Sequence, residues 1–320
     1  MIKRTIKVFR RSKKERAKAS FLKLNLSELL ETFALQARAP RYRLDKDSVG
    51  PIVSLTSFPA RIDSAWIPIE CMFQQTLQPS RIILVLSREE FPGTNLPKAL
   101  RKQQERGLEI LWIERNIRSY GKFLPVKRLH PDRDIVTIDD DLFYERNLLA
   151  KLVDAAQRHP KAIIGQRGWE IGFERDALLP YRQWSKARLE SPPELTFLTG
   201  VGGIYYPAEV DFCDKLLDED LAMKICPTGD DIWFWAMARL RNVPAVCLGN
   251  NGIRPIRRLQ DGPKLWTLNG AAGGNDKQLA DLFSRFPALS DNLQAYLITR
   301  QPKQRSCHAT QVDPWARSGS

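Results

Sequence analysis

Short apolar runs recur along the chain from about residue 50 onward, and segments with a helical pattern lie between them. The first four runs are residues 52–55, 81–87, 108–113 and 134–138. The helical segments are residues 66–76, 97–106, 121–129 and 145–158. Because the runs are apolar throughout instead of alternating with polar residues, they predict strands that are buried on both faces. This strand–helix alternation predicts the α/β class, with a mostly parallel sheet flanked by helices.

The second half of the chain has a less regular pattern. Residues 162–167 and 243–248 are expected to be strands, because both are short and apolar. Residues 230–242 predict a helix. The glycine-rich residues 196–207 are expected to form a loop or the edge of a strand.

The pattern divides the chain into three expected parts. Residues 1–45 form a basic N-terminal extension that contains a helix, because residues 22–35 have apolar side chains at helical spacing. Residues 46–300 form a single α/β domain, and residues 301–320 form a polar tail.

Positive charge is concentrated at the start of the chain. The formal net charge is +13, and residues 1–20 hold nine lysines or arginines and one acid, which leaves +5 for the other 300 residues. Ile2, Ile6 and Phe9 have helical spacing among these cations, which suits a helix lying on an anionic membrane surface. A solvated tail and a nucleic-acid-binding arm are the alternatives that the pattern leaves open.

Composition disfavours several other classes of protein. The five cysteines are scattered without a C-x-x-C pair, which indicates a reducing compartment rather than a disulfide framework or a zinc site. No apolar run reaches the roughly 20 residues of a transmembrane helix, and no apolar signal-peptide region follows the basic start. We therefore expect a cytoplasmic protein, peripheral on the inner face of the cell membrane if the basic arm binds there.

Three consecutive aspartates follow the fourth predicted strand. In an extended segment, Asp139 and Asp141 would point to one side and Asp140 to the other. The C-terminal ends of parallel strands are where such sheets bind ligands, and carboxylates suit Mg²⁺ or Mn²⁺ bridging to phosphates. The alternative is that these acids simply precede the helix that begins near Glu145.

A second pair of acids, Asp230 and Asp231, follows Gly229 and opens a predicted helix. An acid at this place could serve only as a helix cap. It could instead be a general base, because desolvation beside Trp233 and Trp235 would raise the pKa of a carboxyl group there.

Two further loops carry groups that bind phosphate. Thr56, Ser57 and Arg61 follow the first strand, where the loop of a parallel sheet usually binds a nucleotide. Arg118 and Lys122 lie between the third strand and the next helix, where two cations suit a diphosphate. Ordinary surface-loop chemistry is the alternative for both loops. The sequence contains neither the dinucleotide pattern G-x-G-x-x-G nor the P-loop pattern G-x-x-x-x-G-K-[ST].

Taken in order, seven segments resemble bacterial glycosyltransferases of the family 2 type, which have the GT-A fold. The segments are VSLTSFPARI, QQTLQPSRIILVLS, RSYGKFLP, VTIDDDLFY, TGVGGIYYP, GDDIWFWAMA and GGNDKQLADL. They lie within about residues 50–285. The resemblance implies a GT-A (Rossmann-like) catalytic domain that uses Mn²⁺ or Mg²⁺ and a nucleotide-sugar donor.

On the donor side, the resemblance implies that Asp139 and Asp141 form the D-x-D motif of the family. Asp141 would ligate the metal ion together with Asp139, and Asp139 or Asp140 would lie near the nucleotide ribose. The other expected contacts to the nucleotide or its diphosphate are Thr56, Ser57, Arg61, Arg118 and Lys122.

On the acceptor side, Asp230 and Asp231 match the acid pair of the family, and Asp231 matches its catalytic base. The first acid of the pair is often glutamate, so Asp230 departs from the pattern by one methylene group. Gly202, Gly203 and Trp233 are expected to contact the acceptor.

The expected reaction is an inverting sugar transfer to a glycan or lipid-linked acceptor, in the synthesis of cell-surface polysaccharide or lipopolysaccharide. Direct displacement needs a base on the incoming hydroxyl and charge stabilisation on the departing diphosphate. A metal-dependent phosphatase or phosphotransferase is one alternative, which Phe143 disfavours at its place two residues after Asp141. A basic nucleic-acid-binding protein is another, disfavoured because the basicity is concentrated in residues 1–20. The sequence leaves the donor base, the sugar, the acceptor and the linkage open.

Overall fold

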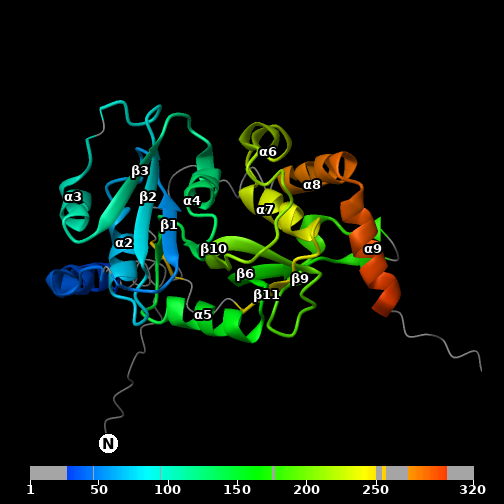
Figure 1. Ribbon diagram of the computed structural model, residues 1–320, viewed down its shortest axis with the longest axis horizontal. Helices are drawn as coiled ribbons and strands as arrows, with labels where there is room; N and C mark the ends of the chain where they lie inside the picture. The colour runs from blue at the N-terminus through cyan, green and yellow to red at the C-terminus, as the bar shows by residue number, and fades with distance from the viewer. Residues whose placement is uncertain are drawn as a thin grey trace, which may run out of the picture.

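A mixed eight-stranded sheet runs through the middle of the molecule (Figure 1). The computed structural model describes residues 27–45, 47–93, 95–174, 177–249, 254–256 and 273–300, and the predicted basic arm and polar tail lie outside them. The strands of the sheet are β1 (Ile52–Thr56), β2 (Arg81–Ser87), β3 (Leu108–Ile113), β4 (Ile135–Thr137), β6 (Ile163–Glu170), β9 (Ser185–Lys186), β10 (Thr196–Tyr206) and β11 (Ala245–Cys247). The helices labelled in Figure 1 are α2 (Trp66–Phe73), α3 (Lys98–Gln104), α4 (Leu124–Leu129), α5 (Leu148–Arg158), α6 (Glu219–Ile225), α7 (Asp230–Arg239), α8 (Gly274–Arg285) and α9 (Ala288–Arg300).

The strand order brings three strand ends to one edge of the sheet. The order is β11-β6-β10-β4-β1-β2-β3, with β9 beside β6. Strands β1, β2, β3 and β4 all run parallel to one another. Strand β10 is antiparallel to both of its neighbours, β4 and β6, so β6 runs in the same direction as β4. The C-terminal ends of β1, β4 and β6 therefore meet at the edge where β10 begins.

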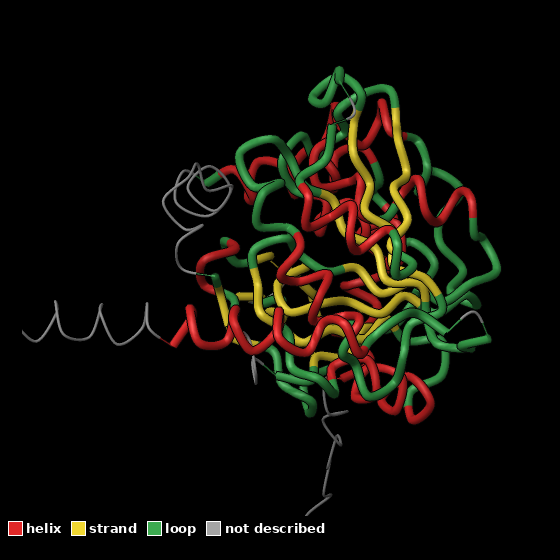
Figure 2. Tube along the Cα trace, turned by 90° about the vertical axis from the view of Figure 1, so that its left-hand side faces the viewer, coloured by secondary structure: helices red, strands yellow, loops and turns green. Residues whose placement is uncertain are grey.

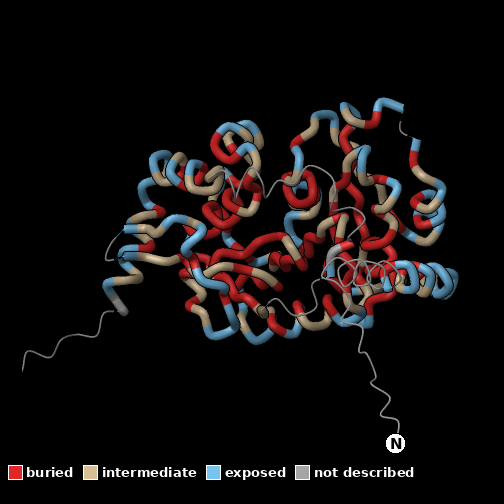
Figure 3. The backbone as a smooth tube through the Cα atoms, turned by 180° about the vertical axis from the view of Figure 1, so that it is seen from behind, coloured by how far each residue is buried: buried red, intermediate tan, exposed pale blue. Residues whose placement is uncertain are grey.

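Helices cover both faces of the sheet, which gives a three-layer arrangement (Figure 2). Side chains from β1 and β2 alternate between two apolar cores: Ile52 and Val85 belong to one, and Val53 and Leu84 to the other. Helices α4, α6 and α7 complete the first core, and α2, α3 and α5 complete the second. Figure 3 shows the buried residues concentrated along the strands and on the helix faces that pack on them. The α/β class predicted from the uninterrupted apolar runs is confirmed.

Strand β10 is the main departure from the expected secondary structure. Residues predicted to be a loop or strand edge form an 11-residue strand in the interior of the sheet. Its pairing with β6 shifts register between Thr199 and Ile204, where Gly202 and Gly203 have φ angles of 92° and 103°. Only glycine adopts such angles readily, so the glycines mark a bulge within the strand instead of its end.

Helix α7 is buried on most of its surface. Its first turn carries Asp230 and Asp231, whose negative charge is favourable at a helix N-terminus. The residues that follow are apolar on all sides of the helix, which is typical of a helix that lies inside a core. The helix thereby holds the second acid pair firmly against the sheet.

Candidate active site

Two groups of carboxylates meet at the edge of the sheet where β1, β4 and β6 end. Asp139 follows β4, and Asp230 opens α7. The ammonium of Lys122 lies between them, with its Nζ 3.1 Å from Asp139 Oδ1 and 3.3 Å from Asp230 Oδ2. The structure thus brings together acids that are separated by about ninety residues in the sequence.

Lys122 is the buried link between the two groups of acids. It lies in a 3-10 helix (Arg118–Lys122), and its side chain is only 8% exposed. Burial opposes the charge of the ammonium, but Asp139 and Asp230 more than offset this and raise the pKa of Lys122 well above its usual range. The lysine is therefore charged, and both of its carboxylate partners depend on it.

Arg61 is the second cation of the site, and it holds the other two aspartates. Its Nη1 lies 2.9 Å from Asp140 Oδ1 and 3.0 Å from Asp141 Oδ2. Ser57 Oγ donates a 2.7 Å hydrogen bond to the remaining oxygen of Asp140. Asp140 is consequently buried with both oxygens engaged, whereas Asp141 keeps one oxygen free of these contacts.

The strict alternation predicted for the three aspartates is wrong in one respect. Asp140 and Asp141 share Arg61, although alternation would place them on opposite sides. The reason is that β4 ends at Thr137 and the aspartates lie in the turn before β5 (Leu142–Phe143), where the side-chain alternation of a strand no longer applies. Asp139 is held separately, by Lys122 and through its backbone N–H, which donates to the Tyr144 hydroxyl.

Asp230 and Asp231 differ in how much freedom they keep. Asp230 is 6% exposed and accepts a 2.8 Å hydrogen bond from Ser119 Oγ. Asp231 is half-buried and accepts a 3.0 Å hydrogen bond from the backbone N–H of Gly200. Burial, and then the charge of Asp230, raises the pKa of Asp231 to about 7. A carboxylate with this pKa is suited to accept a proton near neutral pH.

Gly200 is a site residue that the sequence analysis overlooked. A Cβ atom at this position would lie 2.6 Å from Lys122 Nζ and 3.4 Å from Asp231 Oδ1. The glycine therefore allows the strand to approach the Lys122 ammonium and to donate its N–H to Asp231. Its signal in the sequence is the glycine cluster at residues 199–203, in which only Gly202 and Gly203 are expected to contact the acceptor.

Replacing Gly200 with alanine should destabilise the fold. The added methyl group would displace a lysine that two carboxylates hold in place, and overpacking of this kind typically costs about 1–3 kcal/mol. Urea unfolding of Gly200→Ala and Gly93→Ala measures the difference, because a Cβ at Gly93 meets only the Asn95 side chain at 3.7 Å. Equal stability of the two variants would mean that Lys122 is not fixed where the structure has it.

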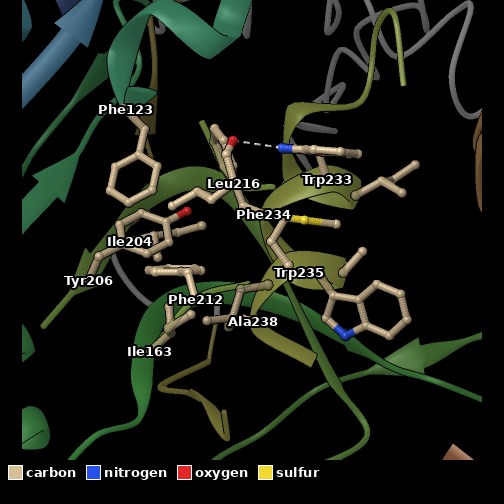
Figure 4. Packing of buried hydrophobic residues seen from close by; sticks show 14 of the residues in the cluster. Phe123, Ile163, Ile204, Tyr206, Phe212, Leu216, Trp233, Phe234, Trp235 and Ala238 are labelled. Atoms are coloured by element: carbon tan, nitrogen blue, oxygen red, sulfur yellow. Dashed lines mark hydrogen bonds between the residues drawn. The ribbon is translucent and has the colours of Figure 1, made fainter. Parts of the chain in front are cut away.

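Three predicted acceptor residues are not at this site. A Cβ on Gly203 would face the Thr137 carbonyl and the Leu148 side chain, in the interior of the sheet layer. Gly202 is buried beside it in the bulge. Trp233 is completely buried, and its indole N–H donates to the Leu216 carbonyl (Figure 4). In this structure Trp233 packs in the core, and the two glycines allow the backbone conformation of the bulge.

Two predicted donor contacts are engaged elsewhere. Arg118 is exposed, and its guanidinium donates a 2.8 Å hydrogen bond to the Pro227 carbonyl. Thr56 Oγ donates to the Val85 carbonyl on the neighbouring strand. Ser57, Arg61 and Lys122 do reach the site, where each contacts an aspartate instead of standing open to a phosphate.

The acids at this edge outnumber the cations that face them. Lys122 and Arg61 pair with four of the five aspartates, and the fifth, Asp231, accepts from the Gly200 N–H. Burial followed by the charge of Asp139 raises the pKa of Asp141 to about 6. A divalent cation would relieve this repulsion, and oxygen-only ligands suit Mg²⁺ or Mn²⁺. In the described ranges no group of three or more metal-ligating side chains is arranged to hold an ion by itself. One or two carboxylates are enough for Mg²⁺ when substrate phosphates supply further ligands, so Asp139 and Asp141 fit the metal that the resemblance implies.

A small cavity of about 30 Å³ lies behind Asp231, between α7 and strands β6, β10 and β11. Tyr206, Phe234 and Arg239 are among its mostly apolar lining residues. A volume of this size admits about two water molecules and is far too small for a sugar ring. A substrate of that size would therefore have to reach Asp231 from the open edge of the sheet.

No protein-family model and no curated protein sequence matches the chain. Similar solved structures include TarS 1-349 from S. aureus in complex with UDP, at 12% identity over 63% of this chain and 58% of that chain, with a TM-score of 0.41. The mannosyltransferase PcManGT from Pyrobaculum calidifontis, in complex with GDP-Man and Mn²⁺, has 14% identity over 88% and 87% of the two chains and a TM-score of 0.41. The UTP-bound UGPase from Acinetobacter baumannii has 10% identity over 79% and 100%, with a TM-score of 0.38. The chain thus spans little more than half of the length of the TarS chain that it matches.

Proposed function

We propose that this chain is a metal-dependent glycosyltransferase that moves a sugar from a nucleotide-sugar donor to an acceptor hydroxyl with inversion at the sugar carbon. One observation carries the proposal. A carboxylate with a pKa near 7, Asp231, lies beside a separate carboxylate pair, Asp139 and Asp141, and Lys122 links the two groups. Inverting transfer needs one base and one site that neutralises a departing diphosphate, and these are the two chemistries present.

Asp231 is the proposed base. It would take the proton of the acceptor hydroxyl as the hydroxyl oxygen forms its bond to the sugar carbon and the bond from that carbon to the diphosphate oxygen breaks. The Gly200 N–H, which donates to Asp231 Oδ1, orients the carboxylate and leaves its other oxygen available to the hydroxyl. Asp230 is held by Ser119 and Lys122 next to Asp231, where it contributes to the raised pKa of Asp231.

Asp139 and Asp141 are the proposed metal-holding residues. Bound Mn²⁺ or Mg²⁺ would neutralise the negative charge that develops on the departing nucleoside diphosphate. Asp140 would face the nucleotide. Its two oxygens are held by Ser57 and Arg61, which makes it a rigid part of the nucleotide site. In this arrangement Lys122 positions the acids.

A thermal-shift screen tests the proposal. UDP, GDP and CMP sugars, each with and without Mn²⁺, are added to the purified chain. One nucleotide class is expected to raise the Tm by several degrees only when Mn²⁺ is present, because ligand at about 100 times its Kd adds about 2.7 kcal/mol of stability. Stabilisation of equal size without the metal, or by none of the nucleotides, would contradict the proposal.

The place of action that we propose is an anionic membrane surface, in the synthesis of cell-surface polysaccharide or lipopolysaccharide on a glycan or lipid-linked acceptor. Within the described residues no helix is long and apolar enough to span a bilayer. The helix at residues 27–38 nevertheless exposes Leu29, Leu30 and Phe33, which are 58%, 60% and 70% exposed. This apolar face follows closely on the +8 segment at residues 1–20, and the combination suits an anionic bilayer.

Removing this apolar face should weaken binding to anionic vesicles. The variant with serine at Leu29, Leu30 and Phe33 is expected to co-sediment with phosphatidylglycerol vesicles several-fold less than the unmodified chain, because lost apolar burial cannot be replaced by charge alone. Leu129→Ser and Leu189→Ser, at leucines that are also exposed, are the matched controls and should bind normally. Vesicle binding that survives the triple change, or that is absent in the unmodified chain, would contradict the assignment.

A further inference from the structure

An arginine on β6 lies close to the proposed base, on the side away from the metal-holding acids. In the pairing of β6 with β10, Arg167 is opposite Thr199. The next residue along β10 is Gly200, whose N–H donates to Asp231. Strand β6 lies two positions from β4 in the sheet, so Arg167 is about 10 Å across the strands from the Asp139 side of the site.

Arg167 lies on the face of the sheet that α7 covers. Side chains two residues apart on a strand share a face, as do residues paired across a ladder. Trp169 is opposite Phe197, whose ring contacts that of Trp235 in α7 with centroids 5.9 Å apart. Trp169 and Arg167 therefore face the same layer as the helix that carries Asp231.

Two aromatic rings support the guanidinium. Its carbon lies 5.5 Å from the ring centroid of Trp169, and the Trp169 and Tyr181 rings are 6.1 Å apart at an angle of 68°. Tyr181 begins the 3-10 helix Tyr181–Gln183, and its backbone N–H donates to Asp276 of α8. Arg167, Trp169 and Tyr181 are all half-buried, so each keeps some surface toward solvent.

The charges of Asp231 and Arg167 both act on the Tyr181 hydroxyl. Burial and then the charge of Asp231 raise the pKa of this hydroxyl, whereas Arg167 lowers it. Tyr181 is therefore within electrostatic range of both Asp231 and Arg167. Across the described ranges Arg167 has a ring contact but no ion pair, which leaves its fork free to bind an anion.

We propose, on the basis of the proposed function, that Arg167, Trp169 and Tyr181 form an acceptor subsite that selects a sugar carrying a carboxylate or a phosphate group. Aromatic faces with a few placed polar groups are the usual lining of a small-molecule site. A guanidinium binds carboxylate and phosphate in the same two-pronged manner. An acidic acceptor would otherwise be repelled by the five aspartates beside it, and Arg167 supplies the compensating charge on the acceptor side.

The test compares acidic and neutral sugars on the full chain, with the nucleoside diphosphate found by the screen and Mn²⁺ already bound. Methyl glucuronide, glucose 6-phosphate and methyl glucoside are titrated, and their Kd values are measured by saturation-transfer NMR. At least one acidic sugar is expected to bind about 10-fold more tightly than methyl glucoside, since a charge-assisted hydrogen bond contributes on this order. The two acidic sugars distinguish a carboxylate from a phosphate as the preferred group.

In Arg167→Gln the ratio of the Kd of methyl glucoside to the Kd of the preferred acidic sugar should fall to near one. Arg167→Lys should keep part of this preference, because the positive charge remains while the two-pronged geometry of the guanidinium is lost. Arg158→Gln, at an exposed arginine of α5 on the other face of the sheet, is the matched control and should keep the full preference. Equal binding of acidic and neutral sugars by the unmodified chain, or an unchanged preference in Arg167→Gln, would overturn the subsite. If nucleotide binding with Mn²⁺ is intact in that case, the subsite fails while the proposed function stands.

Discussion

Replacing Asp231 with asparagine is expected to lower kcat about 10³-fold while leaving nucleotide binding intact. A positioned general base contributes on the order of 10²–10⁴-fold, and asparagine cannot take up the proton of the acceptor. The amide oxygen can still accept the 3.0 Å hydrogen bond from the Gly200 N–H, so the local geometry should persist. Release of nucleoside diphosphate from the donor sugar in the presence of acceptor measures the loss.

Asp218→Asn is the matched control for this experiment. Asp218 is also an acid at the start of a helix, and its side chain accepts from the Leu221 N–H as the N-cap of α6. If Asp231 were only a helix-capping acid, the two variants would behave alike, with normal turnover and a small loss of stability. A near-normal rate for Asp231→Asn would therefore remove it as the base.

The pH dependence gives a second readout of the same residue. Because the pKa of Asp231 is raised to about 7, the rate should rise with pH up to about that value and then level off. Stability changes with pH in the opposite direction to the rate. The folded chain keeps a proton on Asp231 between about pH 4 and 7 that the unfolded chain has released, so stability falls as pH rises through this window. At pH 8 the Asp231→Asn variant should consequently have a higher Tm than the unmodified chain.

Replacing Lys122 with methionine should cause the largest loss of stability among the site variants. The change leaves Asp139 and Asp230 without the ammonium that lies 3.1 Å and 3.3 Å from them. Removing one partner of a buried ion pair typically costs about 3–5 kcal/mol, because the remaining charge stays buried without compensation. Thermal unfolding without added metal should show a Tm lower by about 6 °C or more.

Lys277→Met provides the comparison for this loss. Lys277 pairs with Asp281 on the surface of α8, with its side chain 76% exposed. Exposed pairs of this kind contribute little, so its Tm should stay close to that of the unmodified chain. If Lys122→Met unfolded at the same temperature as Lys277→Met, the two carboxylate groups would not depend on Lys122.

Much of the fold followed from the apolar pattern, because buried parallel strands and amphipathic helices leave strong local signals. Strands β1, β2 and β3 begin and end close to the predicted residues. The exception was β10, where a glycine bulge inside a strand has the same local composition as a loop. Only pairing with both neighbours distinguishes these two structures, and pairing partners are not visible in a single sequence.

The acids of the site were also identifiable, whereas their partners were not. Asp139, Asp141 and Asp231 stand at strand or helix ends, which is a local feature. The contacts of Lys122 with Asp230 and of Gly200 with Asp231 join segments about 110 and 31 residues apart. Arg118 was assigned to a diphosphate because of its charge, but the direction of its side chain, toward Pro227, depends on the tertiary structure.

The most direct test of the account is calorimetric titration of the nucleoside diphosphate with and without Mn²⁺, on the unmodified chain, Asp141→Asn and Asp231→Asn. In the proposed mechanism Asp141 binds the metal ion and Asp231 accepts the proton of the acceptor hydroxyl. Binding is expected to require Mn²⁺ in the unmodified chain, to be lost in Asp141→Asn and to be retained in Asp231→Asn. Binding that is independent of the metal, or equal in all three proteins, would contradict the proposed mechanism.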